Sequence, residues 1–180
     1  MITHKVSNRK QENAMSYERV KEYFEQVGLP ERVVVRDHIG DTVEHAAEAI
    51  GCEPARIAKT MSFRLQHEGG HPILIVMAGD ARVDNRKYKE LFHEKAAMIP
   101  GEQVEAAIGH APGAVCPFAI CDGVSVYLDV SLRRFSTTFA AGGSLNSTVE
   151  LSPEELETYT APAFVAWVDV CKDWAAEPEV

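Results

Sequence analysis

The sequence predicts a mixed α/β fold, in which helices flank a sheet that contains both parallel and antiparallel strands. Segments with the period of helices alternate along the chain with segments that have the two-residue period of strands. Several strand segments are joined by short loops typical of hairpins, which a purely parallel sheet would not contain. Hydrophobic residues make up 46% of the 180 residues, which is enough for one buried core. We therefore expect a single domain.

The first half of the chain is expected to begin with a leader and then to alternate helices and strands. Residues 1–15 are polar and aperiodic, and we interpret them as a disordered leader ahead of a domain over residues 16–180. Ser16 is a suitable N-cap for a first helix, which Gly28 would end. The elements expected next are a strand at 33–36, a helix between Thr42 and Gly51, strands at 59–66 and 72–79 around a hairpin loop, and a helix from Asp84 to about residue 92.

The second half repeats the alternation with shorter segments. Glycine after a helical pattern and proline at its start are the signals that place the helix ends here. The elements expected are a strand at 95–99, a helix from Pro100 to Gly109, strands at 124–128, 137–141 and 148–151, a last helix capped by Ser152 with Pro153 in its first turn, and a frayed tail at 175–180.

Composition and cysteine spacing exclude several classes of protein. The formal net charge is -9, whereas proteins that bind the nucleic-acid backbone on their own usually carry a basic surface. No apolar run approaches the roughly 18 residues of a membrane span, and the N-terminus lacks a signal-peptide pattern. The four cysteines form no CxxC pair and are too few for a disulfide scaffold in a chain of this length. We interpret them as reduced thiols of a cytoplasmic protein.

The segment GHAPGAVCPF, residues 109–118, is neither a helix nor a regular strand. Gly109 and Gly113 allow the backbone to adopt positive φ and to approach a ligand, while Pro112 and Pro117 stiffen the loop. Such a loop can present backbone N–H groups to a carboxylate, a phosphate or a developing oxyanion. A helix end followed by a tight turn explains the same residues, and both interpretations stay open.

Two further features allow a functional and a structural interpretation. Lys59 shares the apolar face of its strand with Met61 and Phe63, where lysine is unusual. Its side chain either extends to solvent at the start of the strand or meets an anionic group at the mouth of a pocket. In AAGGSLNSTVEL, residues 140–151, the paired glycines either form a hairpin turn or let a ligand approach the backbone.

Four segments taken together resemble the YbaK/EbsC family, which is similar to the editing domain inserted in bacterial prolyl-tRNA synthetases. They are IAKTMSF at 57–63, AGDARVDNRKYKELF at 78–92, GHAPGAVCPF at 109–118 and AAGGSLNSTVELSPEEL at 140–156. The resemblance covers roughly residues 16–160. It implies a mixed α/β domain with a curved, barrel-like sheet flanked by helices, and trans-acting hydrolysis of the ester of mischarged aminoacyl-tRNA, with proline tRNA the first candidate.

The resemblance also assigns roles to residues. Lys59 would position the terminal adenosine of the tRNA, with Thr60 beside it. Backbone N–H groups of the loop that contains Gly109 and Gly113 would orient the ester carbonyl and stabilise its oxyanion, and Gly142 would lie in the far wall. An aminoacyl ester is already activated, and a neighbouring ribose hydroxyl can assist, so holding it and admitting water is sufficient. No metal or cofactor is expected.

Other residues of these segments leave alternatives open. His110 and Pro112 are expected to contribute to substrate binding, although His110 is equally explained as a hydrogen-bonded loop histidine. Cys116 beside His110 suggests a nucleophile, or a zinc ligand together with Cys121, but the resembled mechanism needs neither and the spacing matches no usual zinc site.

Two positions depart from the family pattern. Several members place a serine and an aspartate where this sequence holds Ala141 and Thr148, so the resemblance assigns neither the amino acid removed nor deacylation of cysteinyl-tRNA.

The expected partner is the 3′ acceptor end of a mischarged tRNA. Because the chain is acidic, we expect weak affinity for whole tRNA. An aminoacyl-tRNA synthetase is a candidate partner that would bind the tRNA in its place. Two alternatives remain: a binding module of the same fold without turnover, and a hydrolase of a small aminoacyl ester.

Overall fold

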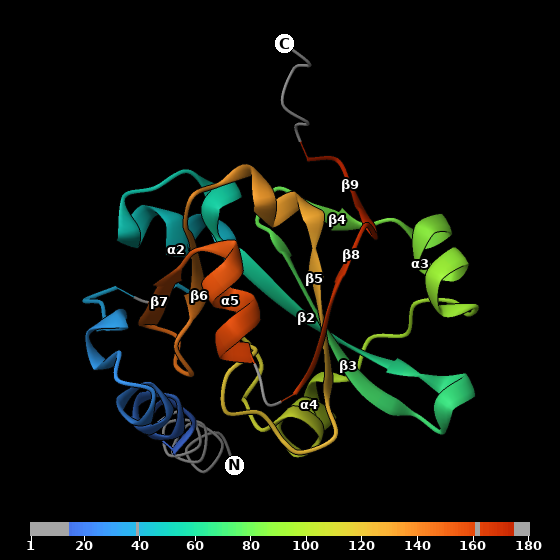
Figure 1. The fold of residues 1–180 in the computed structure, drawn as a ribbon, viewed down its shortest axis with the longest axis horizontal. Helices are drawn as coiled ribbons and strands as arrows, with labels where there is room; N and C mark the ends of the chain where they lie inside the picture. Colours follow the sequence, from blue (N-terminus) through green and yellow to red (C-terminus); the bar gives the residue numbers. More distant parts are fainter. Residues whose placement is uncertain (1–14, 39, 161–162, 175–180) are drawn as a thin grey trace, which may run out of the picture.

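The computed structural model describes residues 15–38, 40–160 and 163–174, whose strands form three sheets. Figure 1 shows the helices placed around these strands. The largest sheet has the strand order β2-β3-β5-β8, in which β2 and β3 are antiparallel and the other two pairs are parallel. This combination is the mixed α/β fold that the sequence predicts. The strands of this sheet are β2 (Ala58–Leu65), β3 (His71–Ala78), β5 (Ser125–Asp129) and β8 (Phe164–Val168).

A second sheet, antiparallel throughout, has the order β1-β7-β6. It meets the first sheet where Ile57, just before β2, forms a parallel bridge with Phe139 of β6. The described strands do not close into a barrel, so the curved, barrel-like sheet of the sequence-based expectation is in fact separate sheets joined at this point. The strands are β1 (Val33–Val35), β6 (Thr138–Ala141) and β7 (Ser147–Leu151), and a two-stranded sheet pairs β4 (Arg82–Val83) with β9 (Cys171–Lys172).

Most of the helices begin where the sequence signals place them. Thr42 caps α2 by accepting a hydrogen bond from the His45 N–H, and Asp84 caps α3 in the same way. Ser152 and Glu155 form a reciprocal capping box, with N–H···O distances of 2.9 and 3.1 Å. The helices are α2 (Val43–Ile50), α3 (Asn85–Phe92), α4 (Gly101–Ile108) and α5 (Pro153–Thr160), after a first helix of which residues 15–26 are described.

The core lies on both sides of β3, whose last six residues are fully buried between the helices. The aromatic rings of Phe24 from the first helix and Phe118 from the loop after α4 meet edge to face, with centroids 5.0 Å apart. The first helix is thereby fastened against the glycine- and proline-rich loop.

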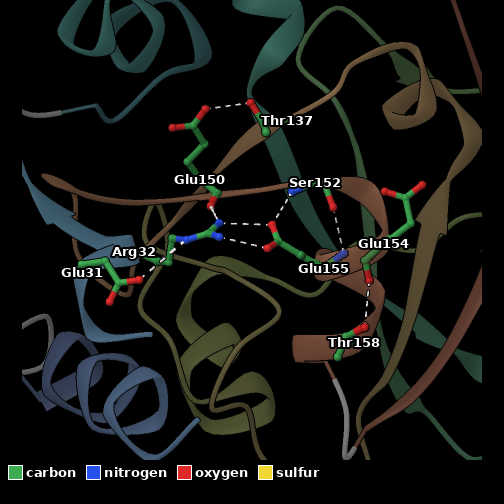
Figure 2. A network of polar contacts seen from close by, with 8 residues as sticks. All are labelled: Glu31, Arg32, Thr137, Glu150, Ser152, Glu154, Glu155 and Thr158. Carbon is green, nitrogen blue, oxygen red and sulfur yellow. Dashed lines mark hydrogen bonds and ion pairs between the residues drawn. The ribbon is translucent and has the colours of Figure 1, made fainter. Parts of the chain in front are cut away.

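A polar network fastens the segment before β1 to the end of β7 and to α5, as Figure 2 shows. The Arg32 guanidinium donates to both carboxylate oxygens of Glu155 at 3.0 and 3.1 Å and to the backbone oxygen of Glu150 at 3.0 Å. The Glu150 side chain accepts from the Thr137 hydroxyl at 2.7 Å. These bonds fix the outer edge of the second sheet.

Several sequence-based expectations are wrong in detail. Segment 95–99 forms no strand, because it meets the edge of β2 only around one bridge, Met98 to Phe63, before Pro100 turns the chain away. Met15, which was expected in the leader, and Ser16 both lie within the first helix, so Ser16 does not cap it. The rest of the expected leader, residues 1–14, and the tail at 175–180 lie outside the described residues. The strands β4, β8 and β9 were not predicted.

Candidate functional site

A pocket of about 330 Å³ opens where the two larger sheets meet beneath α2. Its floor is the start of β2, one wall is the hairpin that joins β6 and β7, and α2 forms the roof. The pocket is lined by residues from 36–50, 57–60, 113–115 and 139–148. It thus brings together three of the four segments that the sequence analysis singled out.

The strand register decides which side chains face this pocket. Ala141 of β6 lies directly opposite Thr148 of β7, so both point to the same face of the second sheet. The chain after β1 runs along the hairpin: the Arg36 N–H donates to the Asn146 oxygen at 2.6 Å, and the Gly40 N–H donates to the Leu145 oxygen at 2.7 Å. Ala141 and Thr148, the two departures from the family pattern, therefore both line the wall.

Lys59 lies at the floor, partly buried. Its ammonium group donates to the backbone oxygens of Ala81 at 2.7 Å and Gly79 at 3.5 Å. Burial lowers the pKa of Lys59 from its usual value, because desolvation disfavours the charged form. Lys59 also borders a second cavity, on the face of β2 that carries Met61 and Phe63. The side chain thus neither extends freely into solvent nor pairs with a carboxylate of the described residues.

Thr60 and Gly113 offer unused polar groups to the same pocket. The buried Thr60 hydroxyl has no hydrogen-bond partner within the described part of the chain. The N–H of Gly113 has no acceptor among these residues either. Gly113 is exposed at φ +88°, and a Cβ there would lie 3.0 Å from the Leu145 side chain. Both residues of the pocket lining therefore carry a donor without a competing partner in the described part of the chain.

Gly109 and His110 serve the fold rather than this pocket. Gly109 ends α4 in the left-handed conformation, donates its N–H to the Glu105 oxygen at 2.8 Å and accepts a hydrogen bond from the Arg19 guanidinium. His110 is 0% exposed and lies between the Ser16 hydroxyl and the Phe118 oxygen, the latter at 2.7 Å. Burial lowers the pKa of His110 to about 4, so the ring is neutral at pH 7.

The other expected binding residues also lie outside the pocket lining. Pro112 is exposed beside Gly101 at the start of α4. Gly142 is buried in the hairpin, where its N–H donates to the Ser147 oxygen at 2.9 Å and a Cβ would lie 2.8 Å from the Ser147 hydroxyl. Gly142 thus shapes the wall from behind.

Cys116 is enclosed with its sulfur 3.4 Å from His110 Nε2. Complete burial raises the pKa of the Cys116 thiol to about 12, so it is protonated at neutral pH and lacks the thiolate that a nucleophile requires. No group of three or more potential metal-ligating side chains gathers anywhere in the described ranges.

Arg36 is the pocket residue that the sequence analysis missed. It follows β1, and its Nε donates to the Thr148 hydroxyl at 3.2 Å. Asp41, also in the lining, pairs with His45 at 2.7 Å. Arg36 and Lys59 are the cations of the lining, and neither has a carboxylate partner within the described residues. The lining thus holds more cationic than anionic side chains, although the whole chain carries a formal charge of -9.

Comparison with known proteins gives a family match and several related chains. The family described as the aminoacyl-tRNA editing domain matches residues 39–159. The uncharacterized protein YwhH of Bacillus subtilis is 46% identical over 160 residues, which cover 89% of this chain and 99% of YwhH.

No helix within the described ranges is long and apolar enough to cross a membrane.

Two further relatives connect the chain with prolyl-tRNA synthetases. Proline–tRNA ligase of Limosilactobacillus fermentum is 32% identical over 95 residues, which cover 51% of this chain and 17% of that enzyme. A crystal structure provisionally described as a trans-editing enzyme for prolyl-tRNA synthetase superposes with a TM-score of 0.74 at 29% identity, covering 87% of this chain and 97% of that one.

Proposed function

The chain belongs to the aminoacyl-tRNA editing domain family, and we propose that it is a trans-acting hydrolase that removes a wrongly attached amino acid from tRNA, with proline tRNA as the first candidate. The observation that carries the proposal is the pocket at the junction of the sheets. It combines a partly buried lysine, an unpaired hydroxyl and an open backbone N–H in about 330 Å³. This space suits the 3′ end of a tRNA with its aminoacyl group.

Each pocket residue takes one part in the reaction. Lys59 holds the terminal adenosine, exchanging its bond to the Ala81 oxygen for one to the substrate. The Gly113 N–H donates to the ester carbonyl oxygen and stabilises the negative charge that develops there. Thr60 donates its free hydroxyl to the bound substrate. Gly109, His110, Pro112 and Gly142 keep the loop and the hairpin in place from outside the lining.

The chemistry is hydrolysis of an activated ester. The oxygen of a water molecule bonds to the carbonyl carbon, and the bond between that carbon and the ribose oxygen breaks. A proton of the water ends on the ribose oxygen, which gives free amino acid and intact tRNA. The neighbouring ribose hydroxyl assists the proton transfer, so the pocket needs to orient the ester and admit water.

The charge distribution supports a model in which this chain binds the 3′ end of the tRNA and a partner protein binds the tRNA body. The cationic side chains of the pocket lining attract the 3′ end, whereas the acidic chain as a whole binds the tRNA body weakly. An aminoacyl-tRNA synthetase that holds the tRNA body would compensate for this in the cytoplasm, where tRNA is charged.

The test is deacylation of a panel of mischarged proline and alanine tRNAs by the wild type, by Lys59→Ala and by Lys89→Ala. Lys89 is an exposed lysine of α3 and serves as the matched control. We expect one noncognate pair to be hydrolysed, with a loss of about tenfold or more in Lys59→Ala, because a charge-assisted hydrogen bond is removed. Survival of the whole panel beside folded protein rules out editing of proline and alanine tRNAs and favours another tRNA, a small aminoacyl ester or a pocket that binds without turnover.

A further inference from the structure

Arg36 is fixed in place while most of its hydrogen-bonding capacity is unused. Asn146 holds its backbone on both sides, accepting from the Arg36 N–H at 2.6 Å and donating to the Arg36 oxygen at 3.1 Å. In the side chain, only Nε has a partner within the described residues, the Thr148 hydroxyl at 3.2 Å. The four N–H bonds on the two terminal nitrogens are therefore available on a side chain that is already oriented.

Most other half-buried arginines of the described ranges pair with a carboxylate of the protein. Arg32 pairs with Glu155 at 3.0 Å, Arg56 with Glu150 at 3.4 Å, and Arg134 with Asp80 at 2.5 Å. Arg64 donates to the Gly70 oxygen at 3.0 Å. Arg64, like Arg36, has no carboxylate partner within the described residues, but it lies outside the pocket lining, whereas Arg36 is part of it.

The charges around Arg36 do not neutralise it. Asp41 is the carboxylate of the lining, and it is occupied by His45 at 2.7 Å. Lys59 adds a second positive charge from the floor. A fixed guanidinium in a pocket with an excess of positive charge favours a ligand that carries an oxyanion, which it binds through two parallel N–H···O bonds.

We propose that Arg36, oriented by Thr148 and Asn146, recognises an oxyanion of the substrate. This inference rests on the proposed function and makes it more specific. The 3′ end of every aminoacyl-tRNA carries a phosphate on the 5′ side of its terminal nucleoside, whereas a carboxylate is present only when the attached amino acid is acidic. The phosphate is the expected source, because it is common to all substrates.

Binding of small probes tests the proposal without turnover. Isothermal titration compares 5′-AMP with adenosine, and the amide-linked 3′-aspartyl analogue of adenosine with its neutral asparaginyl counterpart. Each pair differs by one oxyanion. The proteins are the wild type, Arg36→Gln, Arg36→Lys and, as a control, Arg86→Gln, an exposed arginine of α3 that pairs with Glu90.

We expect the wild type and Arg86→Gln to bind 5′-AMP about tenfold more tightly than adenosine, since a charged hydrogen-bonded pair is gained. In Arg36→Gln the two ligands should bind equally, with the affinity for adenosine unchanged, and Arg36→Lys should keep part of the preference. A preference confined to the aspartyl probe supports the proposal with carboxylate as the source.

The proposal is overturned if the wild type binds the members of both pairs equally or binds none of them, or if Arg36→Gln keeps the wild-type preference. A uniform loss of affinity for all probes in Arg36→Gln also overturns it, since a purely structural brace of Thr148 would act in that way. Deacylation by the wild type is measured separately, so a failure of oxyanion recognition is distinguished from a failure of the proposed function.

Discussion

Acidification should destabilise this protein through His110, a residue that the sequence alone leaves between a functional and a structural role. The ring is 0% exposed, and its Nε2–H donates to the Phe118 oxygen at 2.7 Å. Its Nδ1 therefore accepts from the Ser16 hydroxyl in the neutral form. Arg19 lies close enough to oppose a second positive charge, and the Cys116 thiol is uncharged. A proton added to this ring would be buried without a counter-ion from the described residues.

The magnitude follows from the two pKa values. Burial lowers the pKa of His110 from 6.5 to about 4, so the unfolded chain binds the proton more tightly than the folded one. The stabilising contribution is present above the unfolded pKa and is lost as the pH falls from 6.5 toward 4. Between pH 7 and pH 5 the loss in the free energy of unfolding amounts to about 2 kcal/mol.

Urea unfolding of the wild type and of His110→Gln at both pH values measures this contribution. Carboxylates such as Glu94 and Glu155, whose pKa values are lowered by hydrogen bonds, titrate in both proteins and cancel in the difference. We expect the stability advantage of the wild type to shrink by about 2 kcal/mol on going to pH 5. An advantage that stays constant between the two pH values would refute the burial argument.

Two further substitutions test the pocket and the core. Gly113→Ala should cost about 1–2 kcal/mol of stability because φ is +88°, and should slow deacylation about tenfold because the new Cβ lies 3.0 Å from Leu145 at the pocket. The control Gly123→Ala, at φ +83° with no neighbour within 4 Å, should lose the same stability but keep its activity. An equal loss of activity in both variants would contradict this view. Asp129→Asn should lower the free energy of unfolding by about 3 kcal/mol, because the buried carboxylate oxygen that accepts from the Val170 and Cys171 N–H groups at 2.8 and 3.1 Å is replaced by an amide donor. Urea unfolding of this variant and of the control Asp122→Asn, at an exposed position, measures the loss of stability. A loss below about 1 kcal/mol would count against the prediction.

Local signals were sufficient for most of the helices and central strands. Helix α2 was predicted between Thr42 and Gly51 and occupies the interval between them, because both residues act on neighbouring backbone groups. Strands β2 and β3 were predicted within one residue. The short β4 and β9 form only because they pair with each other across the fold, which no local pattern reports. The apolar, partly aromatic run that forms β8 was a signal that the sequence analysis did not use.

For the site, local reasoning found the residues whose backbone or strand face is unusual. Lys59, Thr60 and Gly113 lie together in the pocket, whereas the conformation of Gly109 and the burial of His110 are explained by the end of α4 and by the first helix. Arg36 carried no signal of its own. The orientation of its side chain depends on Thr148, which is 112 residues away in the sequence. Only the pairing of β1 with β7 brings these two residues together.

The pairing of β1 with β7 has a consequence for the order in which the molecule matures. Residues 33–35 find their partners only at residues 147–149, so closing this pair costs more chain entropy than forming the adjacent hairpin of β2 and β3. During synthesis, β2 and β3 can pair early because they are adjacent in the sequence. The pocket wall that holds Arg36 cannot form until β7 has left the ribosome. The nascent chain therefore remains without a complete pocket until nearly all of the domain has been made, and it gains its ligand-binding capacity in one late step.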